Sequence, residues 1–243
     1  MQHHKAPTTL LKHLMLVALL GGIFSWVFVD ISLRDFINAH PIELVRSITW
    51  ILGRPGQTTF WIVGCIAVWV LARRHSRYCP SVFREPHTLN RFFLQLSIAL
   101  LLSGLIVTLV KYGVGRPRPS EFFRSGAIAF QPFNSSPRYA SFPSGHAQTV
   151  WAGVATCILF FPQSRVWLII AGIFGCVGRV IMLRHYPSDI CAGAIIGTWA
   201  ALAAHQVVIS PRVIGWITPR WRVFVAWAQR VRRSQRMSHQ APQ

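Results

Sequence analysis

The sequence has few acidic residues and few charges of any kind. Only 6 Asp and Glu occur among 243 residues, charged residues make up 13% of the chain, and hydrophobic residues make up 52%. A soluble globular domain carries about 25% charged residues, so the composition excludes one. We therefore expect an integral membrane protein. The few acidic residues are scattered along the sequence and form no cluster of carboxylates.

Cysteines and repeats define no framework either. The five cysteines are an odd number; Cys79 lies in a basic segment and the other four lie within apolar runs. Their spacing matches neither a disulfide framework nor a zinc site. The chain shows no internal repeat. Any chemistry is therefore expected from polar residues at the ends of membrane-spanning helices.

Basic residues, in contrast, are abundant, with 25 Lys and Arg. An excess of this size indicates nucleic acid or anionic lipid as a partner. Because the cations fall between apolar runs, we expect anionic membrane lipids and no nucleic acid. Seven arginines follow Ser210. Since cytoplasmic segments retain Lys and Arg, both termini are predicted to be cytoplasmic. The oligomeric state stays open.

Apolar runs long enough to cross a bilayer recur along the chain. A span needs about 20 mostly apolar residues, and shorter runs suffice where interfacial residues help. The runs lie at residues 12–29, 58–72, 92–110, 147–161, 165–183 and 190–209. This pattern predicts an all-α polytopic membrane protein whose transmembrane domain, residues 1–210, is a bundle of about six helices.

The segments outside these spans carry separate expectations. Lys5 and Lys12 precede the first run, as in a secretory signal, but no Ala-x-Ala cleavage site follows before Asp30, which favours an uncleaved span. Residues 42–52 are predicted to form a short helix along the membrane interface. Residues 211–243 are predicted to be a cytoplasmic tail that begins as a basic amphipathic helix and ends disordered.

The tetrapeptide Pro143-Ser144-Gly145-His146 opens the fourth run. A Ser-Gly pair at a helix start leaves backbone N–H groups unbonded, and the helix dipole adds positive potential, so Ser144 and Gly145 suit an anion such as phosphate. His146 can then move a proton to or from the guest. The same tetrapeptide is also ordinary turn and N-cap chemistry, so it does not decide by itself.

Other polar residues mark the ends of the runs. Those that lie on the same side of the membrane as the tetrapeptide, because successive spans alternate in direction, are Lys111, Arg179 and Asp189. A single cation at a span end is usually an interface anchor. Here two prolines stiffen the chain after the third run and can aim Arg118, and also Arg116, back over the helix end. The cluster indicates a multiply charged anion.

His185 and Asp189 stand four residues apart across Tyr186-Pro187-Ser188. This spacing lets the carboxylate accept a hydrogen bond from one imidazole nitrogen and leaves the other nitrogen free as a nucleophile. The alternative is that both residues only cap helices.

These residues resemble the signatures of the type 2 phosphatidic acid phosphatase (PAP2) superfamily of membrane lipid phosphatases, which is related to the vanadium haloperoxidases. The first signature, a lysine, six residues and Arg-Pro, matches Lys111 through Pro119. The second is residues 143–146. The third matches at Arg179, His185 and Asp189, but Gly178 replaces its serine, which removes one hydroxyl contact.

The resemblance implies a phosphoric ester or diphosphate hydrolase. His185 would attack phosphorus to give a phosphohistidine, Asp189 would orient it, and His146 would protonate the leaving oxygen before water hydrolyses the intermediate. The phosphoryl oxygens would be held by Lys111, Arg118, Arg179, Ser144 and Gly145. No metal and no other cofactor is implied. Whether Arg116 or Arg184 touches phosphate stays open.

The expected substrate is a lipid phosphate or diphosphate, met on the periplasmic face of a bacterial inner membrane. The motifs do not separate undecaprenyl diphosphate, phosphatidylglycerophosphate, phosphatidic acid and lipid A phosphate. A lipid phosphotransferase would use the same phosphohistidine, and a transporter or scaffold would need no nucleophile. Residues 113–142 form a long aromatic-rich loop, which fits either interface anchoring or a lid that guides acyl chains.

Overall fold

The computed structural model describes residues 5–41 and 86–210. The predicted span 58–72, the predicted interface helix 42–52 and the predicted tail 211–243 lie outside these residues. Within the described ranges every regular element is helical, so the predicted all-α membrane fold is confirmed, while the total of six spans stays a prediction.

Five long helical segments make up the described part of the chain. Helix α1 continues through a π-helical turn into α2 without a break. The segments are α1 Lys5–Phe24 with the π-turn Ser25–Val29 and α2 Asp30–Ala39, α5 Pro86–Val114, α7 Gly145–Phe160, α8 Arg165–Ile181 and α9 Pro187–Val208. The predicted loop after α5 contains the short helix α6 Pro119–Ser125 and a 3₁₀ turn at Pro137–Tyr139.

Length and hydropathy identify four of these segments as candidate membrane spans. They are Pro7–Ala39, Thr88–Ser125, Pro162–Ile181 and Pro187–Val208. Helix α7 has 16 residues and matches the short fourth run of the sequence. Large apolar side chains on α1, such as Val17 and Leu20, are more than half exposed, as expected of surfaces that face lipid.

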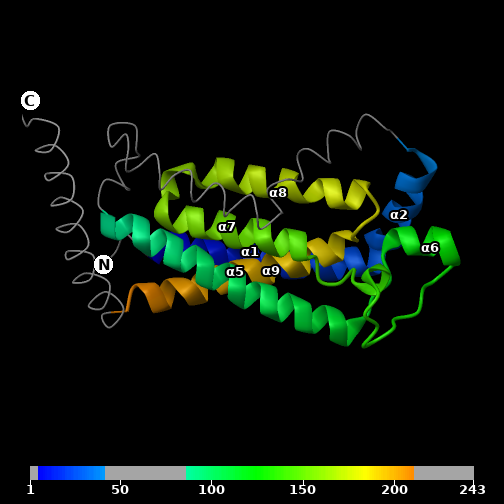
Figure 1. The fold of residues 1–243 in the computed structure, drawn as a ribbon. Helices are drawn as coiled ribbons and strands as arrows, with labels where there is room; N and C mark the ends of the chain where they lie inside the picture. The colour runs from blue at the N-terminus through cyan, green and yellow to red at the C-terminus, as the bar shows by residue number, and fades with distance from the viewer. Residues whose placement is uncertain (1–4, 42–85, 211–243) are drawn as a thin grey trace, which may run out of the picture.

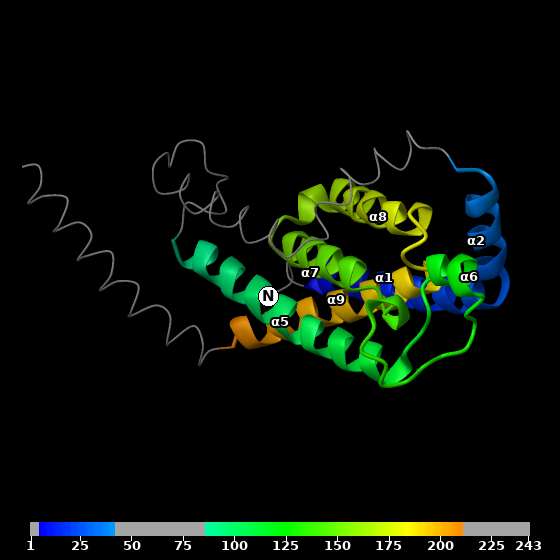
Figure 2. The same ribbon diagram turned by 45° about the vertical axis from the view of Figure 1, so that its right-hand side comes forward.

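Helix α7 is the centre of the bundle. Figures 1 and 2 show it between α8 on one side and α1, α5 and α9 on the other. Nearly all of its residues are buried, including Ala147, Val150, Ala155 and Ile158. Because α7 is surrounded by protein, its first turn, which carries His146, is held from several sides.

Two glycines let α9 approach α7 closely. A Cβ atom at Gly193 would lie 2.3 Å from the carbonyl oxygen of Ser144, and one at Gly197 would lie 2.3 Å from that of Gln148. Glycines four residues apart form one small face of a helix, the usual surface for close packing in membranes. This face sets the distance between the first turn of α7 and α9.

The close approach predicts that Gly197→Ala destabilises the bundle. The added methyl group forces the α7 and α9 backbones apart, and overpacking of this kind costs about 1–3 kcal/mol of unfolding free energy. Gly104→Ala on α5 is the matched control, because a Cβ there meets nothing within 4 Å. Thermal unfolding in detergent measures both variants; equal melting temperatures would contradict the packing account.

Candidate active site

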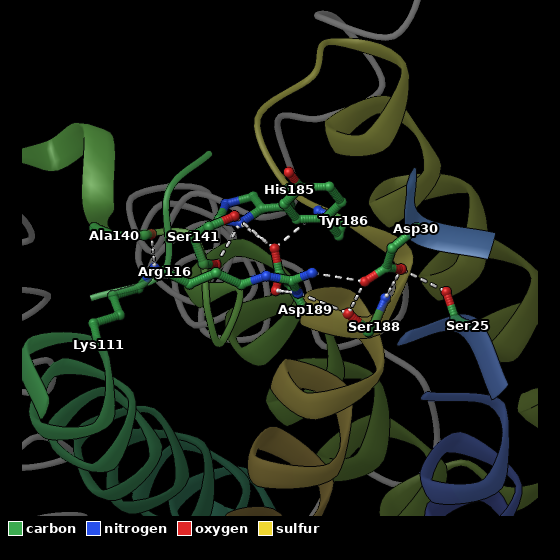
Figure 3. A network of polar contacts seen from close by, with 10 residues as sticks. All are labelled: Ser25, Asp30, Lys111, Arg116, Ala140, Ser141, His185, Tyr186, Ser188 and Asp189. Carbon is green, nitrogen blue, oxygen red and sulfur yellow. Dashed lines mark hydrogen bonds and ion pairs between the residues drawn. The ribbon is translucent and has the colours of Figure 1, made fainter. Parts of the chain in front are cut away.

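The ends of four helices meet at one end of the bundle. Lys111 lies in the last turn of α5, His146 in the first turn of α7, Arg179 in the last turn of α8 and Asp189 in the first turn of α9. Figure 3 shows part of the polar network that forms there. The alternation of helix direction predicted this clustering, and the described residues show it.

A glycine turn directs the chain after α5 into the site. Gly115 has a left-handed φ of 61°, and its N–H donates to the carbonyl of Lys111 at 2.9 Å. A Cβ atom there would lie 1.8 Å from the Gln131 carbonyl oxygen, so only glycine fits. The Ser141 N–H then donates to the carbonyl of Arg116 at 3.0 Å, which holds residues 116 and 141 side by side.

The end of α8 places His185 beside Arg179. The N–H groups of Arg184 and His185 both donate to the carbonyl of Arg179, at 3.0 and 3.3 Å. Leu183, which lies between Arg179 and Arg184 in the sequence, adopts a left-handed φ of 53° and folds the chain back over the helix end. The main chain therefore fixes the spacing of two residues of the third signature.

His185 is oriented through its Nδ1 atom. Nδ1 donates to the carbonyl oxygen of Ser141 at 2.8 Å, whereas Oδ2 of Asp189 lies 3.8 Å away, too far for a hydrogen bond. The Ser141 hydroxyl donates to the same Oδ2 at 2.6 Å. The direct His185–Asp189 hydrogen bond expected from the spacing is thus replaced by a contact through Ser141, and the described residues provide no hydrogen-bond partner for Nε2.

The Asp189 carboxylate has no exposed surface. Besides Ser141, it accepts from the backbone N–H of Tyr186 at 2.8 Å and from Nη1 of Arg116 at 2.6 Å. The first of these bonds caps α9, so the capping alternative and the orienting role are compatible. A carboxylate with this many donors stays ionised and fixed in place.

Cations lie close to His185, since the charges of Lys111 and Arg118 act on its ring. Nζ of Lys111 donates to the Ala140 carbonyl at 2.7 Å, and its Cε lies against Gly145. Arg118 and Arg179 each bury an Nε donor for which the described residues provide no acceptor. The charges of Arg179 and Arg184 both act on Arg118. Three of the residues assigned to phosphate therefore lie together with unused donors.

Ser144 is more occupied than the sequence indicated. Its hydroxyl accepts from the Ala147 N–H at 3.3 Å as the N-cap of α7, and its own N–H donates to the Asp189 carbonyl at 3.0 Å. The expectation that the Ser144 N–H holds phosphate is therefore not met in this structure. The first-turn N–H groups of Gly145 and His146 have no acceptor within their helix, so they remain as donors at this point.

His146 is anchored to the neighbouring helix. Its Nε2 donates to the carbonyl of Gly175 on α8 at 3.1 Å, which leaves Nδ1 for proton transfer. The charges of Arg179 and His185 both act on its ring. His146, Arg179 and His185, which belong to the second and third signatures, therefore lie close together near the start of α7.

Two residues of the site were not predicted from the sequence, and the role of a third was left open. Asp30 and Ser141 are buried and belong to the network around Asp189, and Arg116 joins them instead of pointing toward the cations. A carboxylate next to an apolar run was the available signal for Asp30, because such residues are expensive in membranes and usually functional. Nothing in the sequence pattern marked Ser141.

Burial lowers the pKa of the His185 imidazole, which lies between α8 and α9. Its surroundings exclude water and so disfavour the imidazolium form, and the nearby Asp189 opposes this only in part. At neutral pH the ring is therefore neutral, with its proton on Nδ1 and its lone pair on Nε2.

Comparison with known families agrees with this geometry. The family model of the PAP2 superfamily matches residues 92–211, which include every residue of the three signatures. This part of the chain is therefore similar to the PAP2 superfamily. A crystal structure of the PAP2 type phosphatidylglycerolphosphate phosphatase from Bacillus subtilis has the same fold, with a TM-score of 0.52 and 12% identity over 83% of this chain and 98% of that chain.

Curated relatives carry the names of lipid phosphatases. The lipid A 1-phosphatase of Rhizobium johnstonii is 41% identical over 107 residues, which is 44% of each chain. The undecaprenyl-diphosphatase of Sulfolobus acidocaldarius is 25% identical over 195 residues, 79% of this chain and 84% of the relative. The match spans less than half the length of the first of these. These names agree with the phosphoric ester hydrolase expected from the sequence.

The buried imidazole predicts a titration midpoint for His185 below the usual pH of about 6.5. Below pH 6.5 the unfolded chain takes up a proton that the folded site rejects, so this residue lowers stability as the pH falls. Histidine-selective NMR in detergent micelles measures the midpoint, and the signal absent from His185→Gln assigns it. A midpoint at or above 6.5 would contradict the account.

Proposed function

We propose that the protein is a membrane lipid phosphatase that acts through a phosphohistidine at His185. The observation that carries this proposal is the state of the His185 ring: Nδ1 is bound to Ser141, Nε2 has no hydrogen-bond partner among the described residues, and the charges of Lys111 and Arg118 act on it. A neutral imidazole next to Arg118 and Arg179 is suited to attack a phosphorus atom that carries negative oxygens.

In the first step the Nε2 lone pair forms a bond to phosphorus while the bond from phosphorus to the leaving oxygen breaks. His146, protonated on both ring nitrogens once the anionic substrate is bound, gives its Nδ1 proton to that oxygen, which leaves as an alcohol or as a lipid monophosphate, while its Nε2–H stays on the Gly175 carbonyl. Lys111, Arg118 and Arg179 balance the charge of the phosphoryl oxygens, and the first-turn N–H groups of α7 add donors.

In the second step water attacks the phosphohistidine. His146, now neutral, takes a proton from the water, the bond from phosphorus to Nε2 breaks, and phosphate leaves. The lone pair returns to Nε2 of His185, so both histidines regain their starting forms. The cations of the site neutralise charge throughout, and no metal takes part in either step of this scheme.

An apolar groove supports a lipid as the substrate. The groove lies between α1 and α9, has a volume of about 260 Å³, and is lined by residues such as Leu19, Ile23, Trp26, Phe142, Ala192 and Ile195. Phe142 immediately precedes the tetrapeptide 143–146, so the groove begins beside the phosphate site. Trp26 also contacts Phe130 of the aromatic loop, with ring centroids 5.9 Å apart.

The substrate class is therefore a lipid that carries a terminal phosphate monoester or diphosphate. Undecaprenyl diphosphate, phosphatidylglycerophosphate, phosphatidic acid and lipid A phosphate all fit this description. In this proposal residues 1–210 form the phosphatase domain, the site faces the periplasm of a bacterium, and both termini, including the tail 211–243, lie in the cytoplasm next to anionic lipids. The Lys and Arg residues near the N-terminus and after Ser210 support that orientation, because cytoplasmic segments retain positive charge.

Purified protein in detergent should release inorganic phosphate from at least one of the four candidate lipids. His185→Ala should reduce the rate by at least about a thousandfold, because the nucleophile is lost. The matched control is His40→Ala, since His40 is an exposed histidine at the end of α2. Unaltered release in His185→Ala, or appearance of the phosphoryl group on a second lipid instead of in water, would contradict the proposal.

Filling the groove should affect long-chain substrates selectively. Ala192→Phe should lower kcat/KM for a long-chain lipid phosphate roughly tenfold, because the added ring overlaps the space for the chain. The rate with a short, water-soluble phosphate monoester should stay within about twofold of wild type. Ala171→Phe, on the exposed face of α8, is the matched control. Equal losses for both substrates would contradict the groove as the chain site.

A further inference from the structure

A second carboxylate is buried close to the active site and lies outside the three signatures. Asp30 begins α2, directly after the π-helical turn, and only 1% of its surface is exposed. It lies upstream of the family match at residues 92–211. A buried carboxylate requires compensation, because the desolvation of an ion costs several kcal/mol.

The described hydrogen-bond partners of Asp30 belong to its own helical segment or to the active-site end of the bundle. Oδ1 accepts from the Ser25 hydroxyl at 2.7 Å and from the Ser188 N–H at 3.2 Å. Oδ2 accepts from the Ser188 hydroxyl and from Nη2 of Arg116 at 2.8 Å. Two of these donors belong to Ser188, the neighbour of Asp189 (Figure 3).

The π-turn explains how Asp30 reaches these partners. Ser25 and Asp30 are five residues apart, the spacing of a π-helical hydrogen bond, and the Asp30 N–H donates to the Ser25 carbonyl. The wider turn also brings the Ser25 hydroxyl to the Asp30 carboxylate. Single π-turns inside helices are often found at functional sites.

Arg116 connects the two carboxylates. Nη1 donates to Oδ1 of Asp189 at 2.6 Å and to the Ser188 hydroxyl at 2.8 Å, while Nη2 donates to Asp30. The guanidinium carbon also lies 4.1 Å from the centroid of the Trp26 ring and 4.0 Å from that of the Tyr186 ring. Each terminal nitrogen binds a carboxylate, so Arg116 belongs to the network around Asp189.

We propose that Asp30 and Arg116 are positioning residues for the Asp189 carboxylate, and that the first helical segment, residues 5–39, thereby completes the active site. Arg116 holds Asp189, Asp189 holds the Ser141 hydroxyl, and the Ser141 carbonyl holds Nδ1 of His185. Asp30 keeps the guanidinium turned toward Asp189 and away from the phosphate cations. This inference rests on the proposed phosphatase function, because its effect is expressed through His185.

Asp30→Asn tests the inference most cleanly, because it keeps the shape of the side chain while it removes the charge and one of the two acceptor oxygens. Asp35→Asn is the matched control: Asp35 lies on the same helix, its side chain is 52% exposed, and it pairs with Arg34. Arg116→Lys and Arg116→Ala form the second series, with Arg165→Ala at the opposite end of the bundle as its control.

The measurements are kcat and KM for a long-chain lipid phosphate, the inhibition constant of inorganic phosphate, and the melting temperature in detergent. Asp30→Asn should lower kcat roughly 10- to 100-fold, because a small displacement of the nucleophile has this effect. KM and the phosphate inhibition constant should stay within about twofold of wild type. Arg116→Lys should retain more activity than Arg116→Ala, and adding Asp30→Asn to Arg116→Ala should cause no further loss.

Three results would overturn the inference. The first is a kcat for Asp30→Asn equal to that of Asp35→Asn. The second is a tenfold rise in the phosphate inhibition constant with unchanged kcat in the Arg116 variants, which would make Arg116 a phosphate ligand. The third is a kcat that recovers fully at low temperature, where the folded fraction of each variant is restored. If wild type releases no phosphate, the proposed function fails instead.

Discussion

A carboxylate without exposed surface sits at the start of α9, and the rest of the site depends on how its charge is balanced. Leaving such an ion unpaired costs several kcal/mol, more than a marginally stable bundle can lose without consequence. Arg116 provides the counter-charge and Asp30 fixes the direction of Arg116. The network therefore links three parts of the chain: the first helical segment, the segment after α5 and the start of α9.

This network divides the cations of the site into two groups with different tasks. Arg116 contacts two rings and two carboxylates and is assigned a positioning role. Arg118 and Arg179 keep buried donors without an acceptor among the described residues and are suited to an anion. Sequence spacing alone does not distinguish Arg116 from Arg118, since both follow the same helix and both precede a proline.

Much of the site could be predicted from the sequence because helix ends and alternating direction determine which residues meet. That argument correctly grouped Lys111, His146, Arg179 and Asp189. It failed where the main chain supplies the contact: the Ser141 carbonyl binds His185, and the Ser144 N–H is used by Asp189. Sequence patterns describe side chains, and they carry little information about which backbone groups face a site.

The account's central claim is that Ser141 holds Nδ1 of His185 so that only Nε2 can attack phosphorus. The most direct test is to mix the protein with a lipid phosphate labelled in the phosphoryl group, quench in alkali within milliseconds, and identify the labelled residue and its nitrogen. The account predicts label on Nε2 of His185. Label on Nδ1, on another residue, or on no residue during turnover would contradict it.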